Sequence, residues 1–173
     1  MKHWFKWILL LFVAIIPLAG IYLFNNPVLV TEMFTDTGGF SKGERLPLVK
    51  AEEVLGGTVD MQQYKGKPFV AMMAKIDCET CKSSYPMLQK WTQLYPEVPL
   101  VMLGVGSKDE YAKVKNKLNF PFPLLLADEA MQAEYRMKIT PVFYFVDENQ
   151  TIVERMNGFR IKEFESLMES VKR

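Results

Sequence analysis

The stretch of sequence that decides the fold is Phe69-Val-Ala-Met-Met-Ala-Lys-Ile-Asp-Cys-Glu-Thr-Cys-Lys82. Its first six residues form a continuous apolar run, which is typical of a strand buried on both faces of a sheet. After Cys78, apolar residues recur at helical spacing as far as Pro96, at Tyr85, Leu88, Trp91 and Leu94. The sequence therefore predicts a buried strand followed by a helix, with two cysteines at the junction.

Further short apolar runs bounded by turn residues predict the other strands, at 49–50, 58–61, 98–105, 122–127, 142–146 and 151–155. Helices are expected after Ser107, over residues 128–137, and in a C-terminal segment striped by Phe164, Leu167, Met168 and Val171. Strands that alternate with helices and end in a hairpin indicate an α/β fold, with a mixed central sheet flanked by helices.

Cys78 and Cys81 are the two cysteines of the chain. A disulfide that closes so small a loop constrains the unfolded chain little, so a purely structural bridge is not favoured. The N-terminus of a helix carries about half a positive charge, which favours a thiolate at Cys78. Cys81, one turn further on, can resolve a mixed disulfide. A C-x-x-C pair between a strand and a helix therefore predicts dithiol–disulfide exchange.

Metal or haem binding by the pair is the alternative to exchange. Covalent haem attachment requires His after the second cysteine, where the chain has Lys82. A zinc site requires about four ligands, and the single histidine is His3, so no metal or other cofactor is expected. Copper(I) on the two thiolates stays open as an alternative, because soft metals prefer sulfur and the chain has eleven methionines. The methionines within apolar patterns favour core filling instead, at Met72, Met73, Met102 and Met168.

The N-terminal segment 1–24 is expected to be a signal-anchor transmembrane helix. Residues 8–24 are apolar and span about 26 Å as a helix, close to the ~30 Å hydrocarbon core of a bilayer. A cleaved signal peptide is the alternative, but Pro17 breaks the small-residue cleavage pattern around Ala19. Lys2 and Lys6 are expected to stay inside, which predicts a single-pass protein of the cell membrane with a cytoplasmic N-terminus. Its main domain would be extracytoplasmic, in the periplasm or on the outer surface.

The remainder divides into a linker at residues 25–45, punctuated by Gly and Pro, and a domain at residues 46–173. The whole chain has a formal net charge of +1, which gives no reason to expect a nucleic-acid partner.

Over Leu46 to Lys172 the chain resembles the thioredoxin superfamily, specifically its membrane-anchored TlpA/ResA-type thiol–disulfide oxidoreductases. The resemblance is carried by Gly57-Thr-Val-Asp60, Tyr64-Lys-Gly-Lys-Pro68, Cys78-Glu-Thr-Cys-Lys82, Pro86, Phe120-Pro-Phe-Pro-Leu124, Tyr135-Arg-Met-Lys-Ile-Thr-Pro-Val-Phe-Tyr-Phe-Val-Asp147 and Gly158. It implies a thioredoxin-like fold with a helix–strand insert between the C-x-x-C helix and the strand after Pro141. Peroxiredoxins share this insert, but a peroxidatic site would have Thr where this chain has Lys75.

The resemblance also implies roles for particular residues. Pro141 would be a cis-proline facing the cysteines, and the backbone of Thr140 would hydrogen-bond an extended substrate. The sequence alone fits a trans proline at a strand edge equally well. The chain departs from the family at Met72 and Ser84, where carboxylates customarily accept the proton of the resolving thiol. Glu79, Asp77 or water would have to replace them.

The residues flanking the cysteines are expected to tune the redox potential. Asp77, which replaces the family's aromatic residue, and Glu79 are expected to raise the thiolate pKa, whereas Lys75, Lys82 and the helix N-terminus are expected to lower it. Thr80 lies between the cysteines. This balance favours a reductase near roughly −270 mV over a disulfide-forming oxidant near roughly −120 mV, which stays the alternative. The expected partners are thiols and disulfides of exported proteins, for example in cytochrome c maturation. A membrane electron carrier would restore the dithiol.

Overall fold

The computed structural model describes residues 4, 15–18, 20–22, 24–25 and 36–171. The chain divides into two compact units, Met1–Thr37 and Gly38–Arg173. In the first unit the described residues between 15 and 25 are helical. The expected anchor at 1–24 lies largely outside the described residues, and within the described part no helix is long and apolar enough to span a membrane.

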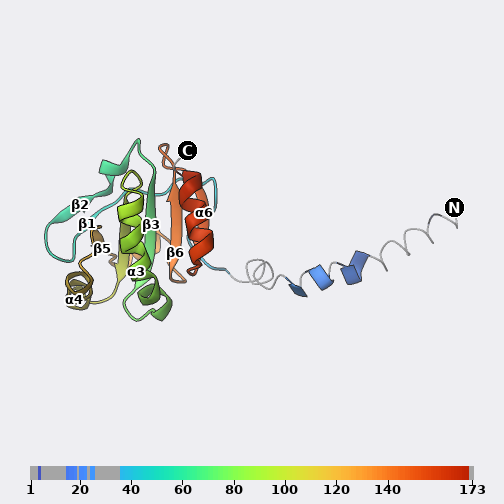
Figure 1. Cartoon of the computed structure of the whole chain (residues 1–173), viewed down its shortest axis with the longest axis horizontal. Coiled ribbons are helices and arrows are strands. Elements are labelled where there is room, and N and C mark those ends of the chain that lie inside the picture. The colour runs from blue at the N-terminus through green and yellow to red at the C-terminus, as the bar shows by residue number, and fades with distance from the viewer. Residues whose placement is uncertain (1–3, 5–14, 19, 23, 26–35, 172–173) are drawn as a thin grey trace. The chain divides into compact units, whose positions relative to one another are not determined.

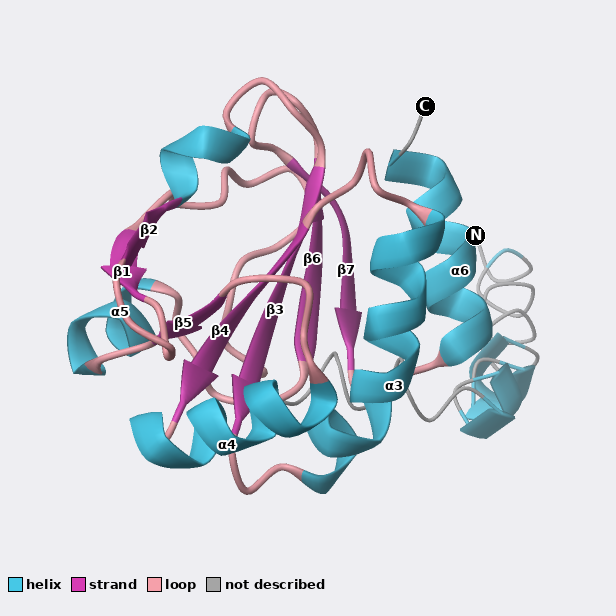
Figure 2. Ribbon diagram, turned by 60° about the vertical axis from the view of Figure 1, so that its left-hand side comes forward, coloured by secondary structure: helices cyan, strands magenta, loops and turns pink. Residues whose placement is uncertain are grey.

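The second unit is built on a five-stranded sheet with the order β5-β4-β3-β6-β7 (Figures 1 and 2). The strands are β3 (Phe69–Lys75), β4 (Leu100–Val105), β5 (Leu124–Leu126), β6 (Val142–Val146) and β7 (Ile152–Asn157). β3, β4 and β5 run parallel, while β6 is antiparallel to both β3 and β7. The predicted mixed sheet is confirmed.

A small hairpin extends the sheet beyond β5. It pairs β1 (Lys50–Glu52) with β2 (Thr58–Asp60), and an isolated bridge joins Glu53 to Leu125. The short 3-10 helix η1 (Met61–Tyr64) follows the hairpin and leads into β3. Both short strands agree with the hairpin expected between residues 49 and 61.

The helices are α3 (Glu79–Leu94), α4 (Lys108–Leu118), α5 (Glu129–Glu134) and α6 (Ile161–Val171). Two strand–helix units, β4–α4 and β5–α5, lie between α3 and β6. The minimal thioredoxin fold has one such unit there, so the second is the expected insert. The α4 helix begins as predicted, with Ser107 as its N-cap. The α5 helix is shorter than the predicted 128–137, because Tyr135 caps it and Arg136 adopts a positive φ of 50°.

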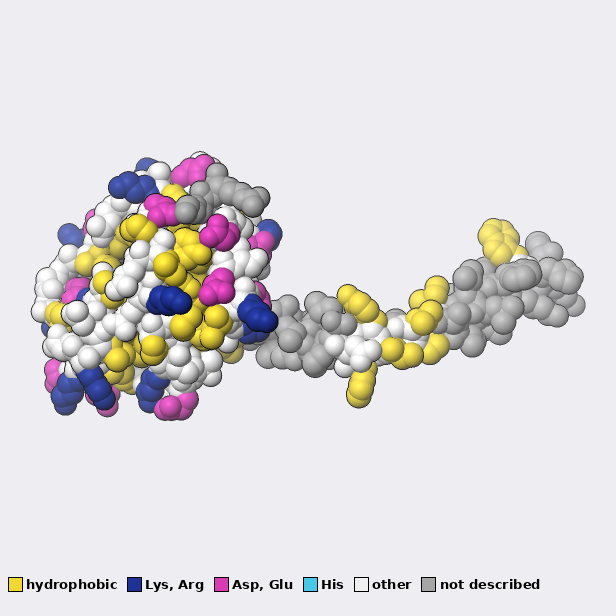
Figure 3. Space-filling model, in the orientation of Figure 1, with side chains coloured by type: hydrophobic (Ala, Val, Ile, Leu, Met, Phe, Trp, Pro, Cys, Tyr) yellow, Lys and Arg dark blue, Asp and Glu magenta, His cyan; other side chains and the backbone are white. Residues whose placement is uncertain are grey.

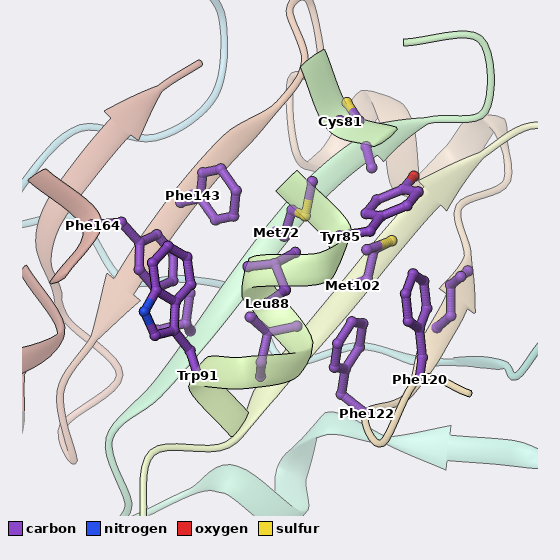
Figure 4. Packing of buried hydrophobic residues seen from close by; sticks show 14 of the residues in the cluster. Met72, Cys81, Tyr85, Leu88, Trp91, Met102, Phe120, Phe122, Phe143 and Phe164 are labelled. Atoms are coloured by element: carbon purple, nitrogen blue, oxygen red, sulfur yellow. The ribbon is translucent and has the colours of Figure 1, made fainter. Parts of the chain in front are cut away.

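Strand residues alternate between two buried clusters, one on each side of the sheet. The α3 face contains Val70, Met72, Ala74, Leu100, Met102, Phe143 and Phe145, packed against α3, α4 and α6. The α5 face contains Phe69, Ala71, Met73, Val101, Leu103, Val142 and Tyr144, packed against η1, α5 and the segment around Phe40 and Leu46. Figure 4 shows the α3 face, with Tyr85, Leu88 and Trp91 pointing from the helix toward the sheet.

Two sequence-based expectations differ from the structure. The helical spacing predicts Leu94 on the buried stripe of α3, but Leu94 lies in the last turn and is 56% exposed. Figure 3 shows that apolar side chains also reach the surface of this unit among the charged ones. The compact unit begins at Gly38, so the last eight residues of the expected linker belong to it. They are held by long-range contacts: Phe40 is buried, and the Gly39 N–H donates to the Arg136 carbonyl at 2.8 Å.

Candidate redox site

The site begins where β3 ends and α3 starts. Cys78 is the N-cap of α3, and its Sγ accepts a hydrogen bond from the Cys81 N–H at 3.1 Å. Cys78 and Cys81 form a disulfide, with their Cα atoms 5.2 Å apart. The helix N-terminus places unpaired N–H groups and a partial positive charge beside Cys78, which favours its thiolate when the bond is reduced. The two cysteines that the sequence singled out therefore lie together in this position.

The two sulfur-bearing residues differ in access. Cys78 is partly exposed, whereas Cys81 is completely buried on the sheet-facing side of α3. Figure 4 shows Cys81 at the end of the helix, above Met72 and Tyr85. An external thiol or disulfide can therefore approach Cys78, and Cys81 can react only with Cys78 or with groups inside the core. This difference in exposure is what an attacking Cys78 and a resolving Cys81 would require, and these two roles stay a prediction.

The charged side chains next to the cysteines all lie at the surface. Lys82 Nζ donates to Glu79 Oε1 at 2.6 Å, and both side chains are exposed, so the pair contributes at most about 1 kcal/mol. Their charges largely offset each other, which weakens the expected opposition of Glu79 and Lys82 at the thiolate. Asp77 and Thr80 are exposed as well.

Pro141 has the predicted cis peptide bond, between Thr140 and Pro141. β6 starts at Val142, whose register partner on β3 is Met73. Because the two strands are antiparallel, continuing this register places Pro141 and Thr140 beside the end of β3 that leads to Cys78. Pro141 is buried, and its carbonyl accepts from the Gly158 N–H at 2.8 Å. The role of Thr140 and Pro141 in binding a substrate stays a prediction.

Among the described residues, Met72 and Ser84 stand where the family has acids, and no carboxylate replaces them in the α3-face cluster. Met72 lies in β3 and is fully buried on the α3 face. Ser84 is also buried, and its Oγ donates to the Cys81 carbonyl at 2.6 Å. The hydroxyl of Ser84 is thus committed to the backbone of the helix.

Two buried tyrosines share a cluster with Cys81. Helical periodicity predicts only that the first, Tyr85, is buried, and the sequence pattern does not indicate the second, Tyr111. Burial raises the pKa of Tyr85 to about 12. Burial, followed by the nearby Tyr85 and the negative charge of Asp77, raises the pKa of Tyr111 as well. Helical spacing can place Tyr85 in the core but cannot show whether its hydroxyl is paired.

Metal binding has limited support from the donor set. Within the described part of the chain, no three or more His, Cys, Asp or Glu side chains come together. The two sulfur atoms of Cys78 and Cys81 would be the soft donors for copper(I), but in this structure they are bonded to each other.

Comparisons with known proteins agree with this geometry. Residues 42–155 match the AhpC/TSA family. The chain is 22% identical to the thioredoxin-like protein YneN of Bacillus subtilis over 119 residues, which cover 66% of this chain and 70% of YneN. It is 30% identical to Peroxiredoxin Bcp of the same organism over 95 residues, or 53% of this chain and 60% of the peroxiredoxin.

The fold is also found in a secreted disulfide oxidoreductase of Mycobacterium tuberculosis that is homologous to Escherichia coli DsbE. That structure has a TM-score of 0.65 and 19% identity, over 71% of this chain and 96% of the other. The sequence relatives are thus a thioredoxin-like protein and a peroxiredoxin, and the fold is shared with a disulfide oxidoreductase, which is consistent with the expected protein-disulfide reductase. The chain belongs to the AhpC/TSA family and carries, on a thioredoxin-like fold, the redox-active cysteine pair of a thiol–disulfide oxidoreductase.

Proposed function

We propose that this protein is a membrane-tethered, extracytoplasmic thiol–disulfide oxidoreductase of the TlpA/ResA type that reduces disulfides of exported proteins. The observation that carries the proposal is the Cys78–Cys81 pair at the N-terminus of α3, with one cysteine accessible and the other buried. This division of access suits a two-step exchange with a protein client.

The reaction transfers two electrons from the reduced pair to the client. The Cys78 thiolate attacks a client disulfide, forms a mixed disulfide and releases the first client sulfur as a thiolate. Cys81 then loses its proton, which this first client thiolate takes up, and the Cys81 sulfur attacks Cys78 Sγ. The second client sulfur leaves and takes a proton from solvent, which replaces the one Cys78 gave up. Cys78 and Cys81 end as the disulfide.

The proposed tether rests on the N-terminal segment. Its described helical residues expose large apolar side chains, namely Ile15, Ile16, Leu18, Ile21 and Phe24. Exposed large apolar side chains favour contact with lipid or protein. Together with Lys2 and Lys6 on its N-terminal side, it supports an anchor whose attached domain faces outward. A membrane electron carrier would then return the disulfide to the dithiol.

The direction of electron flow is part of the proposal. The Glu79–Lys82 ion pair leaves Asp77 as the flanking acid whose charge disfavours a thiolate at Cys78. A less stabilised thiolate makes the dithiol a better reductant. The clients would include exported cysteine pairs that must be reduced before use, such as those of apocytochromes c awaiting haem.

Trapping of clients tests the proposal. In cells that produce the full chain with Cys81→Ala, the mixed disulfide on Cys78 cannot be resolved and should accumulate with exported proteins. The matched control is the variant with both Cys78→Ala and Cys81→Ala, in which these adducts should be absent. If the single variant gives no adducts above this control, the protein is not a protein-disulfide exchanger.

Peroxide reduction is a second candidate function, favoured by the 30% identity to Peroxiredoxin Bcp. In it the Cys78 thiolate would attack a hydroperoxide, release the alcohol and form a sulfenic acid, which Cys81 would convert to the disulfide with loss of water. Lys75, in place of the expected Thr, argues against it. Mixing the reduced full chain with hydrogen peroxide separates the two: a peroxidase would oxidise far faster than free cysteine, and a disulfide reductase would not.

A further inference from the structure

The hydroxyl of Tyr85 is buried without a hydrogen-bond partner among the described residues. The residue is 2% exposed, and it lies in the middle of the α3 face. A buried hydroxyl that lacks a partner destabilises the folded state, and most native proteins avoid it. Its presence beside the redox pair therefore calls for a functional reason.

Tyr85 lies one helical turn after Cys81, on the same side of α3. Aromatic side chains in helices point back toward the N-terminus and over the residue four positions earlier, which here is Cys81. Figure 4 shows this arrangement, with the Tyr85 oxygen on the side of the ring nearest the Cys81 end of the helix. Both residues belong to the same buried cluster. The unpartnered hydroxyl thus faces the region of the resolving cysteine.

Two other buried hydroxyl groups of this region, those of Ser84 and Tyr111, have partners. Ser84 Oγ donates to the Cys81 carbonyl at 2.6 Å, and the Tyr111 hydroxyl lies 3.5 Å from the Val105 carbonyl. The ring of Tyr85 is held edge-on against Phe120, with ring centres 5.1 Å apart. Of these three hydroxyls, that of Tyr85 is the uncommitted donor, and its ring is fixed in place.

We propose that the Tyr85 hydroxyl donates a hydrogen bond to the Cys81 sulfur when the Cys78–Cys81 disulfide is opened, and so positions Cys81 and stabilises its thiolate. This inference rests on the proposed exchange reaction. In the disulfide, the Cys81 sulfur carries no charge and accepts hydrogen bonds weakly. Opening the bond leaves a buried thiol, and burial alone would raise the pKa of Cys81 and slow its attack on the mixed disulfide. A phenol donor offsets that effect, which makes Tyr85 a positioning residue that acts through Cys81.

Tyr85 would act as a donor and not as a base. Because burial raises the pKa of Tyr85 to about 12, the phenol keeps its proton while the thiol titrates. The proton of Cys81 goes to the first client thiolate, as in the proposed reaction. The titratable groups around Cys81 include Cys78, Asp77 in the loop before α3 and Tyr111 on α4, together with the surface pair of Glu79 and Lys82. Apart from Lys75 at the end of β3, the facing strands β3 and β6 contribute apolar residues such as Met72 and Phe143.

Titration of Cys81 in the full chain tests this inference without any exchange reaction. The thiolate absorbance is followed against pH in Cys78→Ala and in Cys78→Ala with Tyr85→Phe. Loss of the donor should lower the thiolate fraction of Cys81 roughly tenfold at a given pH below its pKa, as expected for a hydrogen bond to a charged group. Adding Tyr111→Phe instead is the matched control and should leave the curve unchanged. Identical curves with and without the Tyr85 hydroxyl would overturn the inference.

The exchange kinetics give a second readout, with oxidised glutathione as the probe. Tyr85→Phe in the full chain should leave the first attack by Cys78 unchanged and slow glutathione release from the mixed disulfide roughly tenfold. An unchanged melting temperature of the oxidised variant shows that the fold is intact. Release as fast as in the unmodified chain contradicts the role of Tyr85. If the unmodified chain does not exchange at all, the proposed function fails, while the titration still decides the hydrogen bond.

Discussion

The edge of the sheet around β5 and the N-terminal end of α3 both bury polar side chains, but they satisfy them differently. At the edge, both carboxylate oxygens of Glu53 are paired: Oε1 accepts from Lys115 Nζ and from the Leu124 N–H, and Oε2 accepts from the Leu55 N–H. In α3, one turn after Cys81, the hydroxyl of Tyr85 is buried and has no partner among the described residues.

Two tyrosines of the α5 face, Tyr135 and Tyr144, are paired like the carboxylate of Glu53. The Tyr135 hydroxyl donates to the Pro47 carbonyl at 2.5 Å, and the Tyr144 hydroxyl accepts from the Phe40 N–H at 3.1 Å. Both phenols thereby hold the segment that precedes β1 against the sheet. These buried polar groups of the scaffold are thus paired, whereas the hydroxyl of Tyr85 has no partner among the described residues in the oxidised structure.

The largest loss of stability is expected from breaking the Glu53–Lys115 ion pair at the edge of the sheet. Lys115→Met removes the cation and leaves Glu53 as a buried charge without its counter-ion, which should lower the free energy of unfolding by about 3–5 kcal/mol. Denaturant unfolding of the full chain at neutral pH measures this loss. Lys113→Met, on the exposed part of the same helix, is the matched control and should change stability by less than about 0.5 kcal/mol.

The same pair predicts how stability changes with pH. Burial alone would raise the pKa of Glu53, but hydrogen bonds from Lys115 and from the Leu55 and Leu124 amides outweigh it, so the pKa lies below its ordinary value of 4.5. A carboxyl whose pKa is lowered by folding stabilises the protein above pH 4.5, and this contribution is lost as the pH falls through the folded value. The destabilisation by Lys115→Met should therefore shrink on acidification. A constant difference across the acid range would show that Glu53 is not the group involved.

A smaller effect is expected for Tyr135→Phe on the α5 face. It removes one hydrogen bond and leaves the Pro47 carbonyl without its donor, which should cost about 1–2 kcal/mol. Thermal unfolding of oxidised and of reduced protein should give the same loss, because Tyr135 and Cys81 belong to clusters on opposite faces of the sheet. A loss in only one redox state would contradict the assignment of Tyr135 to the scaffold.

The smallest effect is expected for the matched substitution Tyr85→Phe in the oxidised protein. Removing a hydroxyl that has no partner should change the free energy of unfolding by less than about 0.5 kcal/mol, or raise it slightly. Denaturant unfolding compared with Tyr135→Phe shows the contrast directly. A loss as large as that of Tyr135→Phe would mean that the Tyr85 hydroxyl is already paired in the oxidised state.

Local patterns predicted most of the sheet. The apolar run that starts at Phe69 became β3, and residues 142–146 became β6 with the predicted bounds. The cis bond at Pro141 followed from the family resemblance and not from the local sequence, since a trans proline at a strand edge fits the same residues. These features depend on residues close together in the chain or on a motif of fixed spacing.

The rest depends on contacts between distant residues. Residues 38–45 read as a linker because Gly and polar residues dominate them, yet Phe40 packs against Tyr135 and Tyr144, about 100 positions away. The helical stripe placed Tyr85 in the core but gave no information on its hydroxyl. The sequence predicts opposite effects of Glu79 and Lys82 on the thiolate pKa of Cys78, but in the structure the two side chains form an ion pair with each other. Pairing of side chains is set by the fold, so single-sequence periodicity does not show it.

The central claim is that Cys78 and Cys81 form a reversible, reducing dithiol–disulfide pair. Equilibration of the full chain with glutathione buffers, followed by quantification of the reduced and oxidised forms, tests this claim most directly. The predicted result is reversible interconversion at a potential below that of protein disulfide isomerase, about −180 mV, and toward that of thioredoxin, about −270 mV. A pair that does not interconvert would contradict exchange chemistry, and a potential above about −180 mV would contradict the reductase assignment.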